Sequence, residues 1–455
     1  MRENLFKQVD TILDAKKDEM ISFLIELLKI PSVAGPEKPG MPYGEKVAEA
    51  LAFATKKADD MGFITGTFEN RLNTVDYNNK ETNTGFIAHL DVVPADLDKW
   101  SYPAFDGTIV GNIIYGRGVV DDKGPAVAGL YAMHAVKEAG IDLKHNVRML
   151  LGGAEETGMD DFSEYVKKNP VPEYFFTPDG EFPIGIGERG LIHLSCNRKA
   201  KTDKIMSIKS GSATNIIPEE STAVLRDVST DAIDKIFSKL ALDAKCTAKA
   251  DGENVIITVS GKGGHASIPN TCINSLTALL DILKIVEPEN EFIKELGGSF
   301  PHRVFHGEAM GMTGGLINIS LTQLKFDGEN IFYTVDGRVH ETECTEDYVN
   351  IIRSVLTGEL DIHYVEPHLA DKDSHLVRGL QEIYKAETGL EPECYTMAGL
   401  TYAHHSGKGV VFGPYIPGDG SGNLHAVDES YNLDTMLSCA KMIAHAIIEF
   451  CGVEE

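Results

Sequence analysis

Histidine and acidic residues occur in short groups along the chain, mostly directly after apolar stretches. The first group is His89 and Asp91, which follow the residues Phe86, Ile87 and Ala88 in the stretch GFIAHLDVVP. Because side chains alternate along a strand, His89 and Asp91 are predicted to share one face at a strand end. Such a pair suits a metal ligand and a carboxylate that orients it. The alternative is a strand-end histidine bonded to an aspartate for local structure only.

Two pairs of adjacent acids follow along the chain. Asp121 and Asp122 lie in YGRGVVDDKGP, between a glycine-rich turn and the start of a predicted helix. Capping of that helix is the ordinary alternative for acids at this position. Glu155 and Glu156 lie in MLLGGAEETG, where a strand enters a turn. Since paired carboxylates repel each other unless a cation lies nearby, this pattern favours a functional pair over a solvated surface pair.

Asp179 in YFFTPDG and His425 in NLHAVDE complete the set. Each would be ordinary alone, because aspartate is a common turn former in a Pro-Asp-Gly sequence. Together with the earlier groups they offer imidazole and carboxylate ligands without a thiolate, which suits hydrolytic divalent ions such as zinc. Two ions about 3.5–4 Å apart need a bridging carboxylate, a shared water and a further carboxylate as general base. The acids and histidines named above would fill these positions.

Strands and helices that alternate along the chain would position these residues. Helices are predicted over residues 4–30, 45–61 and 124–139, and short strands near 66–68, 73–77, 145–151 and 174–176, besides the strand that ends at His89. This alternation predicts an α/β domain with an at least partly parallel sheet. In such sheets the chemistry gathers beyond the carboxyl ends of the strands. The candidate residues follow strand ends or lie in loops.

The pattern changes after about residue 187. Alternating strands are predicted over 191–197, 254–259, 316–326 and 331–339, with helices near 230–242, 271–285 and 345–357. The α/β pattern returns at residue 374 and ends in a helix over 434–450. We therefore predict an α/β domain with a mixed, mostly parallel sheet from residues 1–186 and 371–455. An inserted α+β domain with antiparallel sheets, residues 187–370, interrupts it.

The overall composition excludes several classes of partner. The net charge of −27 over 455 residues argues against binding to nucleic acid or to an anionic membrane surface. Seven cysteines without a CxxC pair indicate reduced thiols and no disulfide framework. The polar N-terminal stretch does not resemble a signal peptide, and no apolar run approaches the length of a membrane span. We therefore expect a cytoplasmic protein.

Five motifs, HLDVVP, YGRGVVDDKGP, GGAEETG, TPDG and HAVDE, occur in the same order in the M20 family of dinuclear zinc peptidases. The chain most resembles the PepV-like dipeptidases, which include Xaa-His and carnosinase-type enzymes, over essentially its whole length. The resemblance implies two Zn²⁺ ions per chain, with Mn²⁺ or Co²⁺ as substitutes. It implies that His89 and Asp179 hold one ion, that Glu156 and His425 hold the other, and that Asp121 bridges them. It also implies a cis peptide bond between Asp121 and Asp122.

The same resemblance assigns catalytic roles in a zinc-peptidase-like catalytic domain. Asp91 would orient His89, and Glu155 would act as general base for a metal-bridged water that hydrolyses dipeptides or other short peptides. In the inserted lid domain, His265 would stabilise the oxyanion, and Asn215 and Arg338 would contact the substrate. The sequence departs from the family pattern after Arg338, where Val339 and His340 follow, and at His404, where arginine is usual.

Two other functions stay open at this point. An amidohydrolase of N-acyl amino acids would use the same metals, although aspartate at position 179 resembles the peptidase members of the family. A binding or scaffold protein that had lost catalysis would be expected to lack Glu155 or a ligand, and all of these residues are present. The large insert resembles lids that replace a partner subunit's lid, so we expect a monomer that closes over a short peptide.

Overall fold

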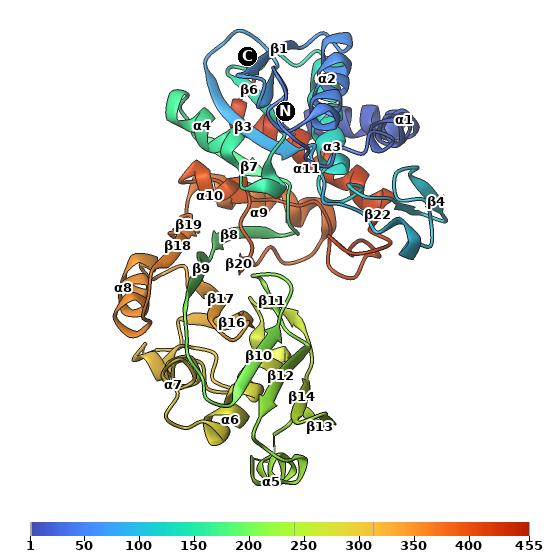
Figure 1. The fold of residues 1–455 in the computed structure, drawn as a ribbon. Helices are drawn as coiled ribbons and strands as arrows, with labels where there is room; N and C mark the ends of the chain where they lie inside the picture. The colour runs from blue at the N-terminus through green and yellow to red at the C-terminus, as the bar shows by residue number, and fades with distance from the viewer. Residues whose placement is uncertain (1, 241, 313, 455) are drawn as a thin grey trace. The chain divides into compact units, whose positions relative to one another are not determined.

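The computed structural model describes residues 2–240, 242–312 and 314–454. These residues form two compact units (Figure 1). Unit 1 combines the chain up to Glu188 with the chain from His368 onward, and unit 2 comprises Arg189–Pro367. The candidate metal ligands all belong to unit 1, whereas Asn215, His265 and Arg338 belong to unit 2.

Unit 1 is built on a mixed sheet with the strand order β1-β2-β6-β3-β7-β21-β8-β19, and β20 pairs with β8. The centre is parallel, since β3 pairs in parallel with β6 and β7, and β7 with β21. The pairs β1–β2, β2–β6, β21–β8 and β8–β19 are antiparallel. This confirms the predicted α/β unit with a mixed sheet. The strands are β1 Ile64–Phe68, β2 Leu72–Asp76, β3 Thr82–His89, β6 Asn146–Gly152, β7 Tyr174–Thr177, β8 Ile184–Glu188, β19 His368–Leu369, β20 Cys394–Met397 and β21 Val410–Val411.

Helices cover both faces of this sheet because its strands are apolar on both sides. In β3, Phe86 and Ala88 join the core formed with α1, α2, α3, α9 and α11, while Ile87 joins a smaller core formed with α4 and α10. The helices of unit 1 are α1 Arg2–Leu28, α2 Glu45–Asp60, α3 Lys123–Glu138, α4 Asp160–Lys168, α9 His375–Thr388, α10 Tyr402–Ser406 and α11 Leu433–Cys451. A separate small sheet joins β4 Thr108–Val110, β5 Ile113–Tyr115 and β22 Ser430–Asn432.

Three neighbouring parallel strands end at one edge of the sheet. Strand β3 ends at His89, β6 is followed by Glu155 and Glu156, and β7 is followed by Asp179. Since β3 lies between β6 and β7, these loops are adjacent in space although they are far apart in sequence. The carboxyl ends of parallel strands therefore gather the candidate ligands, as expected for this class of sheet.

Unit 2 contains an eight-stranded sheet with the order β13-β14-β12-β10-β16-β17-β9-β18, in which every neighbouring pair is antiparallel. Its strands are β9 Gly190–Lys199, β10 Ile205–Ser210, β12 Glu220–Arg226, β13 Lys245–Asp251, β14 Asn254–Ser260, β16 Ile317–Phe326, β17 Asn330–Val339 and β18 Leu360–Val365. A two-stranded ladder joins β11 Ile216–Ile217 and β15 Gly264–His265. The helices are α5 Thr230–Leu240, α6 Ser275–Val286, α7 Glu291–Ser299 and α8 Thr345–Val355. The antiparallel α+β character of this segment is confirmed.

Several elements were not predicted from the sequence pattern, notably α4, α7, β10, β12 and β13. Helix α6 begins at Ser275, later than the predicted start near residue 271, because Asn274 caps it by accepting from the backbone N–H groups of Leu276 and Thr277. Helix α5 ends at Leu240, whereas the predicted helix extends to about residue 242, which the structure describes as non-helical; residue 241 lies outside the described residues.

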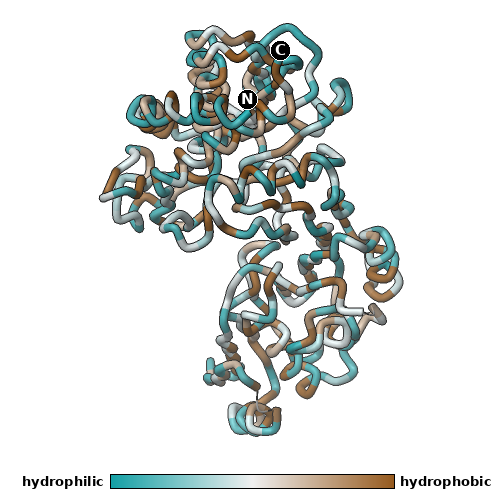
Figure 2. The backbone as a smooth tube through the Cα atoms, turned by 180° about the vertical axis from the view of Figure 1, so that it is seen from behind, coloured by the Kyte–Doolittle hydropathy of each residue, from teal (hydrophilic) through white to brown (hydrophobic). Residues whose placement is uncertain are grey.

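Hydrophobic and hydrophilic segments alternate along both units (Figure 2). Among the described residues, none of the helices combines the length and apolar character that a membrane crossing requires. The seven cysteines are all unpaired by disulfides.

Gly124 limits how helix α3 can start after Asp121 and Asp122. A Cβ atom at Gly124 would lie 2.0 Å from the backbone oxygen of Val119, and backbone cannot move aside as a flexible side chain can. We expect Gly124→Ala to lower the free energy of unfolding by about 3 kcal/mol, measured by urea denaturation.

Gly298, in helix α7, is the matched control. A Cβ atom there would meet nothing within 4 Å, so Gly298→Ala should be neutral or stabilising by up to about 1 kcal/mol. Equal stability of the two variants would contradict this account of Gly124.

Candidate metal centre

Asp121 lies between the two candidate histidine ligands. Its Oδ1 atom is 2.9 Å from Nε2 of His89, and its Oδ2 atom is 3.1 Å from Nε2 of His425. The side chain of His89 is fully buried, whereas that of His425 is 57% exposed. A carboxylate that presents one oxygen to each of two imidazoles has the arrangement required of a bridging ligand.

The remaining candidate ligands surround this trio. Oε2 of Glu156 is 3.1 Å from Nε2 of His425, and Oδ2 of Asp179 is 3.8 Å from Nε2 of His89. Two groups of possible ligand atoms, each within 4.8 Å of one another, are formed by the described residues: His89 with Asp121 and Glu156, and His89 with Glu155 and Asp179. The structure thus brings the sequence-predicted metal ligands and Glu155 together.

The peptide bond between Asp121 and Asp122 is cis, as expected. Asp122 is fully buried, and its Oδ2 atom accepts a hydrogen bond from the backbone N–H of His89 at 3.0 Å. The second acid of this pair therefore fixes the end of strand β3, while the first faces the two histidines.

Asp91 contacts His89 mainly through its backbone. Nδ1 of His89 is 2.9 Å from the backbone oxygen of Asp91 and 3.4 Å from its carboxylate. The carboxylate instead accepts hydrogen bonds from the backbone N–H groups of Glu155, at 3.2 Å, and Glu156, at 3.1 Å. The Asp91 backbone thus orients the imidazole, and its side chain ties the acid pair to the end of β3.

Two further buried acids hold the ligand-bearing loops and were not predicted from the sequence. Asp161 accepts from the backbone N–H groups of Gly153 and Ala154 at 2.7 and 3.1 Å, and from the hydroxyl of Tyr402 at 2.7 Å. Glu429 accepts from the backbone N–H groups around Asp121. Glu429 could have been selected from the sequence because it belongs to the HAVDE motif. Asp161 could not, because it resembles an ordinary acid in the first turn of a helix.

Burial, neighbouring acids and hydrogen bonds strongly shift the pKa values of these side chains. Burial and the nearby Asp179 hold the pKa of Glu155 well above its usual range. Burial raises the pKa of Asp179 to about 7; the nearby His89 acts to lower it, and the acids Asp121 and Glu156 act to raise it. Hydrogen bonds to Asp121 and Glu156 raise the pKa of His425 to about 10.

The pKa values of Asp121 and His89, at the centre of the cluster, are shifted in opposite directions. Burial alone would raise the pKa of Asp121, but its hydrogen bonds with His425 and His89 outweigh burial and lower it. Burial alone would lower the pKa of His89, but contacts with Asp121 and Asp91 raise it. Protons on the imidazoles thus offset the crowded carboxylates, a role that a divalent cation could take.

The donor set fits hydrolytic divalent metal ions. The side chains that converge are imidazoles and carboxylates, without a cysteine among the two groups of ligand atoms. This is the chemistry that zinc, manganese and cobalt accept in hydrolytic sites. The excess of carboxylates over histidines supplies the negative charge that such cations require.

Unit 2 brings two of its three predicted substrate-binding residues, Asn215 and His265, onto neighbouring segments. His265 pairs with Ile216, the neighbour of Asn215, in the β11–β15 ladder, and the backbone oxygen of Asn215 accepts from Ala266. Nδ1 of His265 lies 2.7 Å from the hydroxyl of Ser267. Arg338 is buried on β17, where Asp336 accepts from its Nε and Nη2 atoms at 3.0 and 3.1 Å.

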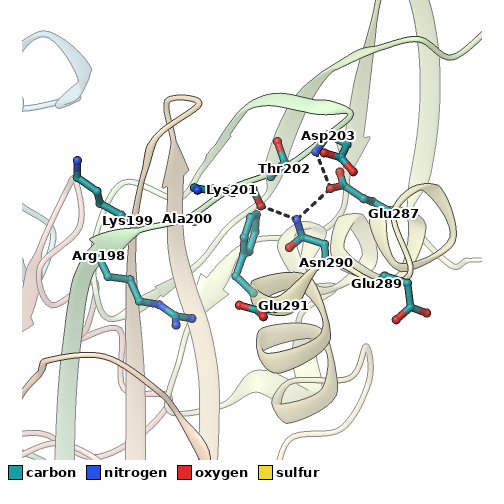
Figure 3. A pocket seen from close by; sticks show the side chains of 11 residues that line it. Arg198, Lys199, Ala200, Lys201, Thr202, Asp203, Glu287, Glu289, Asn290 and Glu291 are labelled. Atoms are coloured by element: carbon teal, nitrogen blue, oxygen red, sulfur yellow. Dashed lines mark hydrogen bonds between the residues drawn. The ribbon is translucent and has the colours of Figure 1, made fainter.

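A cavity of about 470 Å³ lies in another part of unit 2, between the end of β9 and the start of α7 (Figure 3). The side chain of Asn290 donates to the backbone oxygen of Lys201 and to Glu287, which also accepts from the backbone of Asp203. Neither group of possible metal ligands lies there. These polar side chains hold the loops of unit 2 together.

Comparison with known proteins agrees with the geometry of the centre. Residues 85–449 match the family described as Peptidase family M20/M25/M40. The chain belongs to this peptidase family. The matched segment includes the ligand candidates from His89 to His425, so it covers the whole centre described above.

Known proteins match nearly the full chain in sequence or in fold. The Beta-Ala-Xaa dipeptidase of Lactobacillus delbrueckii subsp. lactis is 30% identical over 466 residues, which cover 98% of each chain. The fold is similar to that of the di-peptidase Dug1p from Saccharomyces cerevisiae, with a TM-score of 0.61, 15% identity and 99% coverage of both chains. Human carnosine dipeptidase 1 gives a TM-score of 0.60 at 15% identity, covering 98% of this chain and 99% of its own.

The protonated groups of the centre predict how zinc affinity depends on pH. Metal ions bind deprotonated ligands, so an ion held by Asp179, with a pKa of about 7, and by His425, with a pKa of about 10, would displace their protons. We expect zinc to bind more tightly as pH rises from 6 to 8 and to release protons. Calorimetric titration in two buffers of different ionisation enthalpy measures both effects.

His302→Asn is the matched control, because His302 forms a comparable pair with Asp243, at 2.7 Å, in unit 2. This change should leave the proton release unchanged. An affinity that stays constant or falls between pH 6 and 8 would contradict the prediction.

Proposed function

We propose that this protein is a metal-dependent dipeptidase that hydrolyses the peptide bond of dipeptides or other short peptides. The observation that carries this proposal is the placement of Asp121, which presents one oxygen to His89 and the other to His425 in a chain of the M20/M25/M40 peptidase family. The name of the full-length relative, a Beta-Ala-Xaa dipeptidase, supports a dipeptide substrate.

We assign two zinc ions to the centre, with manganese or cobalt as possible substitutes. His89 and Asp179 would hold one ion, Glu156 and His425 the other, and Asp121 would contribute to both. The short separations of His89 from Asp179 and of His425 from Glu156 support this division. Held by these residues, the ions would supply Lewis-acid chemistry, namely a lower pKa for a water, toward about 7, and polarisation of the scissile carbonyl.

Glu155 is proposed to move the proton. It shares a group of converging side chains with His89 and Asp179, and its backbone is fixed by the carboxylate of Asp91. Its carboxylate would take a proton from the attacking water and deliver it to the leaving amine. Burial and its acidic neighbours, which raise the pKa of Glu155, favour a carboxylate that can hold the proton between these two steps.

We also propose that unit 2 supplies substrate contacts from His265, Asn215 and Arg338. The ladder between β11 and β15 supports a joint role for Asn215 and His265, because it places them on neighbouring strands. The bidentate contact with Asp336 fixes the plane of the Arg338 guanidinium, as recognition of a carboxylate requires. The size of the insert supports a monomer that needs no partner's lid.

The proton-transfer role predicts a sharp difference between two adjacent glutamates. Glu155→Gln should lower kcat for a dipeptide by about 10²–10⁴-fold, because the amide cannot accept the proton. It should still bind two zinc ions per chain. Turnover and metal content after gel filtration measure the two properties.

Glu156→Gln is the contrasting variant, because Glu156 is proposed to hold a metal ion. This change should reduce zinc content as well as turnover. A Glu155→Gln enzyme with full activity would overturn the general-base role.

The substrate class predicts the outcome of a panel of free dipeptides, tripeptides and N-acetyl amino acids. The metal-loaded enzyme should cleave dipeptides with the highest kcat/KM, and a chelator should remove this activity, which zinc or manganese should restore. A preference for N-acetyl amino acids would instead support a deacylase that uses the same centre.

A further inference from the structure

The loop that carries His425 has an unusual backbone and little packing around its ligand. Asn423, His425 and Asp428 adopt positive φ angles of 58°, 60° and 57°. Such angles are uncommon for residues other than glycine and persist only where the surroundings enforce them. Since the His425 side chain is 57% exposed, packing of the imidazole cannot provide that enforcement. Contacts elsewhere in the loop must hold His425 in place.

Glu429, four residues after His425, provides one such contact. Its side chain is completely buried and reaches the loop that carries Asp121. The backbone N–H groups of Gly118, Val120 and Asp121 donate to its carboxylate at 3.0, 3.0 and 3.2 Å. Successive N–H groups that converge in this way form a pocket for an anion. One carboxylate therefore fixes the backbone of the proposed bridging ligand.

Arg117 makes the reciprocal contact, from the Asp121 loop back to the His425 loop. Its Nη1 atom lies 2.5 Å from Oε2 of Glu429, and its Nη2 atom donates to the backbone oxygen of Ala426 at 3.0 Å. The guanidinium also lies over the ring of Trp100, with 5.3 Å to the ring centre. Each loop thus places a buried charged group on the backbone of the other, next to the proposed ligand.

Stability alone does not explain this buried pair. Removing two opposite charges from water costs free energy that their attraction often fails to offset, so a buried ion pair is a poor source of stability. The pair instead fixes the relative orientation of the two loops, because an arginine fork and a carboxylate that accepts from several N–H donors can contact each other in few geometries.

We propose that Glu429, together with Arg117, is a positioning residue that fixes the separation between Asp121 and His425 and thereby sets the affinity for the metal ion that these two ligands share. This inference rests on the proposed metal centre. Neither residue would contact metal or substrate, since each acts through a neighbouring backbone.

Glu429→Gln tests the inference with little change in volume. The amide keeps one oxygen but directs an NH₂ group toward backbone donors or Arg117. The metal-free full chain is titrated with zinc chloride and monitored by calorimetry, or titrated with cobalt chloride and monitored by the visible spectrum of cobalt. We expect affinity for one of the two ions to fall by about 10–100-fold, the usual effect of losing a residue that supports a ligand. The cobalt spectrum should change at partial loading.

Asp76→Asn is the matched control for general destabilisation. Asp76 is also a buried carboxylate paired with arginine, since Nε and Nη2 of Arg148 donate to it at 2.9 Å each, but it lies near the amino end of β6, away from the ligands. Both variants should melt at a lower temperature, but Asp76→Asn should keep wild-type metal affinity and spectrum. Equal metal affinity in the two variants would overturn the inference.

Arg117→Lys keeps the test decisive if Glu429→Gln fails to fold. Lysine retains the charge but cannot contact both Glu429 and the oxygen of Ala426 as a fork. We expect weaker binding of one ion, and wild-type affinity with an unchanged cobalt spectrum would overturn the inference. The wild-type titration separates this result from the proposed function, because a wild-type chain that binds no metal would refute the metal centre itself.

Discussion

The concentration of carboxylates at the carboxyl ends of β6, β3 and β7 is the constraint on which the rest of unit 1 depends. Carboxylates that are buried together lose hydration and repel one another, so each needs a donor or a cation nearby. His89 and His425 supply part of that compensation at Asp121. The remainder comes from backbone N–H groups, which the loops must direct inward. The conformations of the loops are therefore a consequence of the acids they surround.

The acids divide into two layers according to what they face. Asp121, Glu156 and Asp179 face the imidazoles, whereas Asp91, Asp122, Asp161 and Glu429 accept from backbone N–H groups. The outer layer fixes the segments that connect the strands and helices of the centre. Close approach of the backbone is part of this arrangement: a Cβ atom at Gly152 would lie 2.0 Å from the hydroxyl of Tyr402, which donates to Asp161.

The sequence pointed to the residues of the inner layer and to Asp91, but not to the roles of Asp161 and Glu429 in the outer layer. His89, Asp121 and Asp179 could be selected because their residue types suit metal ions and they lie beside apolar strands or glycine-rich turns. Asp161 could not, because its partners are backbone groups of Gly153 and Ala154, and backbone donors carry no sequence signal. The same reason explains the missed strands β10 and β12 in unit 2, whose pairing with β14 and β16 depends on contacts distant in sequence. Local periodicity was informative where the burial of a strand shows in its own sequence, as in the apolar β3 and the alternating β14.

The stretch GFIAHLDVVP shows how the two layers meet in one motif. A backbone oxygen can only accept, so the 2.9 Å contact with the oxygen of Asp91 requires Nδ1 of His89 to carry the proton. Nε2 is thereby directed at Asp121, and it becomes available to a metal ion once its own proton leaves. Because the backbone of Asp91 sets this tautomer, its carboxylate remains available for the N–H groups of Glu155 and Glu156. One residue at the end of β3 thus fixes a proposed metal ligand and the proposed general base, which couples their positions through a single turn of chain.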